Sequence, residues 1–186
     1  MTVYNPYDRQ PVATVDTTDW TGADHALTEA TRAFSKRENW LTVPERIDIL
    51  QNTQDLMLER AETLAKLIAT EGGKPLTDAR IETTRAIEGV GLAVMALKSL
   101  KGEVIPMGSN AASLDHFAYT RHEPCGVVLA YSAFNHPLNL IVHQAIPAVA
   151  AGCPFIVKPA EATPLSCITL VGILREAGLP NPWGQV

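Results

Sequence analysis

Residues 154–165 read "PFIVKPAEATPL" and pass from an apolar run to the start of a helix. The first part, "PFIV", is apolar throughout, as in a strand that is buried on both faces of a parallel sheet. Pro164 then occupies a position that proline favours at a helix start. Lys158 and Glu161 lie between the two elements. Because ligands of open parallel sheets bind outside the carboxyl ends of the strands, these charges mark a candidate ligand site.

The segments around this stretch alternate between strand and helix patterns. Apolar "GVVLAY" (126–131) precedes the helical pattern "NLIVHQAIPAVAAG" (139–152), and after the quoted strand comes the helical pattern "TPLSCITLVGILREAG" (163–178). The order β-α-β-α is typical of a doubly wound parallel sheet. We therefore predict an α/β fold whose carboxyl-terminal part is a partial, Rossmann-like sheet.

The sequence upstream predicts a hairpin, long helices and one antiparallel strand. The expected elements are a hairpin in 2–15, a helix over 22–34, one long helix after the capping box "TVPE" (42–45) that runs to Gly72-Gly73, a helix from Leu76 to Gly102, and a strand in "HFAYTRHEP" (116–124). A boundary near residue 123 divides the chain into an N-terminal region, 1–123, and the first half of a dinucleotide-binding domain, 124–186.

Charge and composition exclude several function classes. The net charge is -5 and the fifteen Lys and Arg residues are scattered, which argues against nucleic acid as a partner. The longest apolar run, "AIPAVAAGCPFIV" (145–157), is interrupted by proline and glycine and is too short for a membrane span, and the first residues lack a secretory pattern. Three cysteines without a CxxC pair argue against a disulfide framework and predict a cytoplasmic location.

Two strand–helix junctions carry the candidate chemistry. Lys158 could donate to ribose hydroxyls or attract phosphate, and Glu161 could accept from a ribose hydroxyl and repel a 2'-phosphate. A solvated surface ion pair is the alternative. At the earlier junction, Asn135 is either the N-cap of a helix that starts around Pro137 or an amide donor to a developing oxyanion. Neither junction contains GxGxxG, so a standard Rossmann phosphate loop is not expected.

Other reactive residue types have more ordinary explanations. His136 and His143 have no third ligand at a suitable spacing, so no metal site is predicted. Cys153 and Cys167 lie in or beside apolar segments and are expected to be small core residues rather than nucleophiles.

Several stretches, in this order along the whole chain, resemble the aldehyde dehydrogenase family. They are "NPYDRQPVATV", "ERIDILQNTQDLM", "LIATEGGKPL", "PCGVVLAYSAFNHPLNL", "AIPAVAAGCPFIVKPAEATPLS" and "LREAGLP". "KPAEATPL" after a strand is among the most specific of them.

The resemblance implies roles for the residues at both junctions. Lys158, Ala160 and Glu161 would bind the adenosine side of NAD(P), and Glu161 favours NAD, with NADP possible. The wall beside the dinucleotide would be formed by Ser132, Ala133 and Phe134. Asn135 would be the catalytic oxyanion donor.

The substrate and the assembly follow from the same resemblance. "SAFNHPLNLIVHQ" looks like the branch that acts on small anionic aldehydes, in which Arg85 and His136 would meet the anionic group; surface or helix packing is the alternative for both. "HFAYTRHEP" would support a homo-oligomer.

The family's nucleophilic cysteine and its glutamate base lie in later motifs, and Cys125, Cys153 and Cys167 do not match the nucleophile's motif. The expectation is therefore an amino-terminal part of an NAD(P)-dependent enzyme that oxidises an aldehyde to a carboxylic acid. We expect this part to be inactive alone. The alternative is a non-catalytic nucleotide-binding or oligomerisation module.

Overall fold

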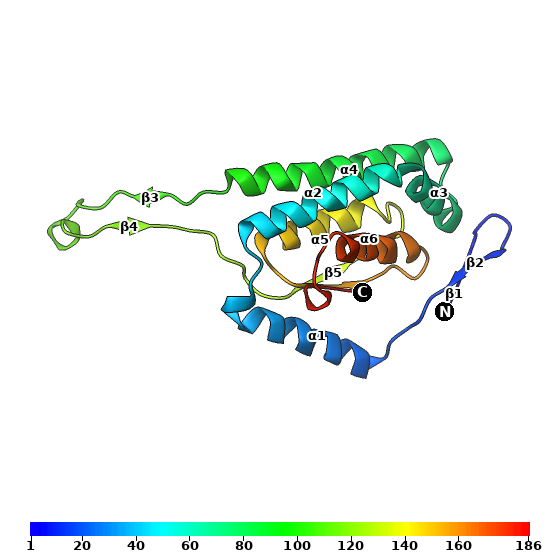
Figure 1. The fold of residues 1–186 in the computed structure, drawn as a ribbon, viewed down its shortest axis with the longest axis horizontal. Helices are drawn as coiled ribbons and strands as arrows, with labels where there is room; N and C mark the ends of the chain where they lie inside the picture. The colour runs from blue at the N-terminus through cyan, green and yellow to red at the C-terminus, as the bar shows by residue number, and fades with distance from the viewer.

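The computed structural model describes residues 1–186 and has the predicted α/β architecture (Figure 1). Its helices are α1 (Trp20–Ser35), α2 (Val43–Glu59), α3 (Ala61–Gly72), α4 (Leu76–Ser99), α5 (Asn139–Ala151) and α6 (Leu165–Glu176), with short 3-10 helices η1 (Arg37–Asn39), η2 (Ala111–Ser113) and η3 (Asn181–Trp183). Its strands are β1 (Thr2–Tyr4), β2 (Pro11–Thr14), β3 (Val104–Ile105), β4 (Ala118–Tyr119), β5 (Val128–Tyr131), β6 (Phe155–Lys158) and β7 (Gly184–Gln185).

The central sheet has three parallel strands in the order β5-β6-β7. Val128 of β5 lies opposite Phe155 of β6, which lies opposite Gly184 of β7. The two quoted apolar runs are therefore paired strands, as their composition predicts. The third strand, β7, forms at the end of "GLPNPWGQV" (178–186).

The helices form layers around this sheet. α5 and α6 contact its strands, α1 contacts β6 and η3, and α2, α3 and α4 pack on α5 and α6 (Figure 1). α5 and α6 thus lie between the sheet and an outer helical layer. This burial explains why both helices are largely apolar and show little polar face.

One continuous hydrophobic core of 30 buried residues joins these layers. It includes Leu50 of α2, Ile68 of α3 and Phe155 of β6, so residues on both sides of position 123 contribute to it. The helices upstream of residue 102 pack on the sheet and on its flanking helices. The division at residue 123 stays a prediction.

The single long helix predicted after the capping box is wrong, because the chain breaks at Arg60 into α2 and α3. Arg60 leaves helical geometry with φ -103° and ψ 12°. Its guanidinium donates to both carboxylate oxygens of Glu176 on α6, at 2.6 and 2.7 Å. The break redirects α3 so that it contacts α6. The capping box itself is confirmed, with Glu45 N–H donating to Thr42 Oγ1 and Thr42 N–H donating to Glu45.

An extended arm carries the antiparallel strands β3 and β4 away from the body (Figure 1). The strand expected in 116–124 is confirmed only for Ala118–Tyr119. Several arm side chains are apolar and exposed, among them Val104 (66%), Phe117 (76%) and Tyr119 (64%). None of the helices is long and apolar enough to cross a membrane.

Candidate functional site

Lys158 and Glu161 come together at the carboxyl end of β6. Lys158 is the last residue of the strand, and its Nζ lies 3.3 Å from Glu161 Oε1. Both side chains are open to solvent, at 53% and 80% exposure. An ion pair this exposed contributes little to stability. The two groups are therefore free to exchange their mutual contact for a polar ligand.

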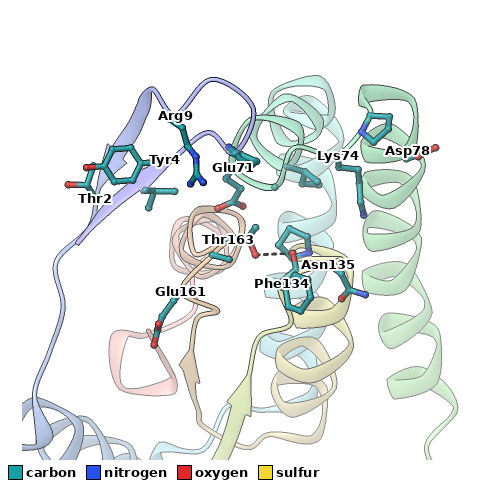
Figure 2. A pocket seen from close by; sticks show the side chains of 17 residues that line it. Thr2, Tyr4, Arg9, Glu71, Lys74, Asp78, Phe134, Asn135, Glu161 and Thr163 are labelled. Carbon is teal, nitrogen blue, oxygen red and sulfur yellow. Dashed lines mark hydrogen bonds between the residues drawn. The ribbon is translucent and has the colours of Figure 1, made fainter.

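A cavity of about 590 Å³ is lined in part by Glu161 (Figure 2). Four parts of the chain line it: the β1–β2 hairpin, the turn between α3 and α4 with the adjoining helix ends, and each of the two strand–helix junctions. Asn135 and Glu161 both reach it, whereas Lys158 is not among its lining residues. Asn135 of the first junction and Glu161 of the second thus line the same cavity.

The hairpin reaches the cavity because it packs closely on the α3–α4 turn. Gly73 ends α3 with a positive φ of 65°, a conformation that favours glycine. A Cβ built on Gly73 would lie 2.7 Å from Pro6 Cγ of the hairpin. Glycine therefore serves both the helix end and the close approach of the hairpin.

Asn135 is not the N-cap of α5, so that alternative is wrong. The helix begins at Asn139, after the residues around Pro137 where the sequence placed its start. Asn135 Oδ1 accepts only from the N–H of its neighbour His136, at 3.1 Å. The side-chain amide N–H groups of Asn135 have no protein acceptor, so they remain available to a ligand in the cavity.

The start of α5 is capped instead by a buried carboxylate from α4. Glu82 Oε1 accepts from the N–H groups of Leu138 and Asn139, at 2.9 and 3.1 Å. Its Oε2 lies 2.5 Å from Lys74 Nζ, and the Glu82 side chain is completely buried. A long-range contact therefore positions the turn that carries Asn135.

The start of α6 is capped in the same way by Glu71 of α3. Its carboxylate accepts from Leu165 N–H at 2.7 Å and from Ser166 N–H at 2.9 Å, and it also contacts the Ser166 hydroxyl. Burial raises the pKa of Glu71, and these hydrogen bonds oppose that rise. Together, Glu71 and Glu82 fix the beginnings of both helices next to the cavity.

Our reading of the sequence missed both glutamates, although each lies on an apolar stripe. Glu71 follows Leu64 and Ile68 at helical spacing, and Glu82 lies between Ala79 and Ala86 on the buried side of α4. A charged residue on a buried helix face requires a polar partner. That mismatch is the signal that could have found them.

The remaining predicted cofactor residues tie the two junctions together. Ser132 N–H donates to Lys158 O at 3.1 Å, and Thr163 Oγ1 donates to Phe134 O at 3.0 Å. Ala160 O accepts from Thr163 N–H, Ala133 is partly buried, and the Phe134 side chain is 66% exposed. The junctions therefore form one bonded unit with an aromatic ring at its surface.

His136 and Arg85, the two residues expected to meet an anionic group of the substrate, lie in different surroundings. His136 Nδ1 lies 3.2 Å from Lys74 Nζ and 3.5 Å from Glu82 Oε2, so it belongs to the network that caps α5. Arg85 is exposed on α4, one turn beyond Glu82, and does not line the cavity. His143 is exposed, and no group of three metal-ligating side chains is present.

Comparison with known proteins assigns the family. The profile of the aldehyde dehydrogenase family matches residues 1–185. The chain belongs to the aldehyde dehydrogenase family. A 3-sulfolactaldehyde dehydrogenase of Priestia aryabhattai is 36% identical over 186 residues, which is 100% of this chain and 38% of that protein. A lactaldehyde dehydrogenase of Methanocaldococcus jannaschii is 36% identical over 177 residues, which is 95% of this chain and 37% of that protein.

Solved structures of aldehyde dehydrogenases share the fold. Glyceraldehyde-3-phosphate dehydrogenase GapN from Methanocaldococcus jannaschii, complexed with NADP, is 33% identical with a TM-score of 0.92 and covers 100% of this chain and 40% of its own. Aldehyde dehydrogenase 21 from Physcomitrella patens, in complex with the reaction product succinate, is 33% identical with a TM-score of 0.94 and covers 99% and 38%. The chain thus spans about two fifths or less of the length of these family members, as their amino-terminal portion.

Two of the three cysteines have the packing role that the sequence predicts. Cys153 and Cys167 are buried, and burial raises the pKa of Cys153 and raises that of Cys167 to about 12. A thiol with a raised pKa is a poor nucleophile at neutral pH. Cys125 is exposed, but it precedes β5 and so lies at the amino end of the strands, away from Asn135.

Proposed function

We propose that this chain forms the cofactor-holding, amino-terminal part of an NAD(P)-dependent aldehyde dehydrogenase that oxidises an aldehyde to a carboxylic acid. The observation that carries the proposal is the pair Lys158 and Glu161, exposed at the carboxyl end of β6 beside a cavity that Asn135 shares. This is the edge of a parallel sheet where ligands bind. Family membership and the NADP bound to GapN support the same assignment.

The side chains at this edge fit the adenosine ribose of a dinucleotide. The Lys158 ammonium offers donors to ribose hydroxyls, and the Glu161 carboxylate offers acceptors, while each is held only by the other. When bound, NAD(P) supplies the acceptor for the hydride that leaves the aldehyde carbon. A carboxylate beside the ribose repels a 2'-phosphate. Glu161 therefore supports a preference for NAD over NADP.

Asn135 is the residue proposed to act on the aldehyde. Asn135 lines the cavity, and its unpaired amide N–H groups would donate to the aldehyde oxygen as negative charge develops on it. The turn that carries Asn135 is fixed from behind by Glu82, which keeps this donor in place before the substrate arrives. The names of relatives that act on sulfolactaldehyde and lactaldehyde support a small aldehyde substrate, anionic in the first case.

Calorimetric titration of the 186-residue chain with NAD tests the cofactor site. We expect measurable NAD binding that Lys158→Ala weakens by about tenfold or more, because one lost charged hydrogen bond is worth about 1.5–3 kcal/mol. Lys98→Ala, which changes an exposed lysine on α4, is the matched control and should bind like the wild type. Equal NAD binding by wild type and Lys158→Ala would refute the site.

An activity assay tests the proposal that the nucleophilic thiol comes from outside this chain. We expect no aldehyde-dependent NADH formation by the chain alone, because its buried thiols have raised pKa values and its exposed thiol is remote from Asn135. Aldehyde-dependent NADH formation by the purified chain, with or without its three cysteines, would contradict the proposed need for a thiol nucleophile supplied from outside this chain.

The exposed arm favours a second role in assembly. Val104, Phe117 and Tyr119 leave apolar surface on a two-stranded ribbon that projects from the body. Such strands offer unpaired edges and apolar side chains to another copy of the chain. We propose homo-oligomerisation through this arm. A solution mass above that of the monomer, reduced by replacing Phe117 and Tyr119 with serine, would support it, and an unchanged mass would oppose it.

A further inference from the structure

Two cysteines from different parts of the chain meet at the amino end of the central sheet. Cys125 precedes β5, and Cys153 lies between the end of α5 and the start of β6. Their sulfur atoms are 3.9 Å apart. The parallel register explains this approach, because Val128 pairs with Phe155 and the segments just before these residues therefore run side by side. The contact lies opposite the ligand edge and plays no part in the proposed cofactor site.

The two thiols differ in their access to solvent. Cys125 is exposed, whereas Cys153 is 2% exposed. A small reagent in solution therefore reaches Cys125 first. Cys153 Sγ is then the nearest thiol to whatever group Cys125 acquires.

The surroundings of Cys153 have opposite effects on its thiol. Burial is the larger effect and raises the pKa of Cys153, while the nearby backbone N–H groups of Gly126 and Cys125 favour its thiolate. The Arg46 guanidinium, which donates to Ala150 O, adds a nearby positive charge. Cys125 Sγ lies 3.9 Å from Cys153 Sγ within these surroundings.

We propose that Cys125 and Cys153 form a reversible intramolecular disulfide, which makes this contact a redox modification site. The oxidant is a small-molecule disulfide such as glutathione disulfide. The Cys125 thiolate attacks one of its sulfurs, so the reagent's S–S bond breaks, one thiolate leaves and a mixed disulfide forms on Cys125. The Cys153 thiolate then attacks Cys125 Sγ and releases the second thiolate. The two protein thiols lose two protons and two electrons, and the reagent is reduced to two thiols.

Bond formation requires only a small movement. A disulfide S–S bond is about 2.0 Å long, so the two sulfur atoms must approach by about 1.9 Å. Exposed Cys125 lies in a segment without helix or strand, where a side-chain rotation meets little packed structure. The new bond would close a loop that contains β5, the Asn135 turn and α5, and would tie the returning end of the arm to the sheet (Figure 1).

The third cysteine provides an internal control. Cys167 lies on α6, is completely buried, and has a pKa raised to about 12 by that burial. It makes no sulfur contact with either of the other cysteines. The proposed chemistry therefore leaves Cys167 as a free thiol.

The test is oxidation of the 186-residue chain with glutathione disulfide, followed by acid quenching, non-reducing intact mass and peptide mapping. We expect a monomer that has lost two hydrogen atoms, a decrease from three free thiols to one, a 125–153 linked peptide, and recovery of all three thiols in dithiothreitol. Because burial raises the pKa of Cys153, ring closure should accelerate as the pH rises toward that pKa.

Three variants separate the possible outcomes. Cys125→Ser and Cys153→Ser should each abolish the loss of two hydrogens, and Cys167→Ser should keep it. If Cys153→Ser fails to fold, Cys125→Ser still decides, because it changes an exposed position. A persistent glutathione adduct on wild-type Cys125, a disulfide-linked dimer as the main product, or an internal disulfide in Cys125→Ser would overturn the proposal.

Discussion

Replacing Glu82 should destabilise the protein far more than replacing any exposed carboxylate on the same helix. Its carboxylate is completely buried and holds two backbone N–H groups at the start of α5 as well as Lys74 Nζ. Glu82→Ala removes all three contacts, leaves the N–H groups of Leu138 and Asn139 without an acceptor, and leaves Lys74 Nζ without its carboxylate partner. Glu82→Gln keeps an acceptor oxygen for the backbone and removes only the charge.

The contacts give an expected magnitude. Each unpaired buried N–H costs about 1 kcal/mol or more. The Lys74 side chain is 16% exposed and keeps some contact with water, so the lost ion pair adds about 2 kcal/mol, which is less than the about 3–5 kcal/mol known for breaking a fully buried pair. Glu82→Ala should therefore lower the free energy of unfolding by about 4 kcal/mol. Glu82→Gln should lower it by about half as much, since its amide oxygen still caps α5.

Urea denaturation followed by circular dichroism measures these differences. Glu88→Ala changes an exposed glutamate on α4 and should stay within about 0.5 kcal/mol of the wild type. Amide exchange at Leu138 and Asn139 should become faster in both Glu82 variants than in Glu88→Ala. If Glu82→Gln and Glu82→Ala unfold at the same urea concentration as Glu88→Ala, the capping role assigned to Glu82 is wrong.

Two further predictions concern stability. Burial raises the pKa of Glu71. Between the ordinary glutamate pKa and this raised pKa, the native state therefore binds more protons than the unfolded chain. The free energy of unfolding should fall as the pH rises through that window and should level off above it. Urea midpoints measured from about pH 4 to about pH 8 should fall with pH in the wild type and change less in Glu71→Gln. Equal pH dependence in the two proteins would count against this role of Glu71. Phe155→Ala empties a completely buried position and should cost about 3–5 kcal/mol in a urea titration, whereas Leu129→Ala, at an exposed position on β5, should cost under about 1 kcal/mol; similar losses would contradict the burial difference.

The sheet and its flanking helices could be predicted because their signals are local. The apolar runs of β5 and β6 and the helical spacing of the segments after them fix the order of the elements within a few residues of chain. The capping box at Thr42 is equally local, since both of its partners lie within one turn. The exposed pair of Lys158 and Glu161 also follows from its spacing directly after a strand.

The missed features depend on contacts between distant parts of the chain. Arg60 interrupts the predicted long helix without a glycine or proline to mark the break, and its guanidinium binds Glu176 on α6. Likewise, Asn135 has a side chain that suits a helix cap, yet the cap of α5 comes from Glu82 on another helix. Local preference was overridden in both cases by tertiary partners that short-range patterns do not reveal.

The cavity, too, depends on contacts between distant parts of the chain. It forms only where the N-terminal hairpin packs against Gly73 and faces the two strand–helix junctions (Figure 2). No single segment contains enough of its lining to predict it. What the sequence did identify were three of its lining residues. Asn135 and Glu161 were identified because each follows a strand at the edge where ligands bind, and Phe134 through the family resemblance.

A nuclear magnetic resonance titration of the chain with NAD tests the central claim most directly, because it locates the bound nucleotide residue by residue. The proposed cofactor site predicts saturable shifts of the backbone amides in 132–135 and at Lys158, Ala160 and Glu161, with the arm strands β3 and β4 unaffected. The same titration of Lys158→Ala should require a much higher NAD concentration. Shifts confined to other surfaces, or an unchanged titration of Lys158→Ala, would contradict the claim that these two junctions hold the adenosine ribose.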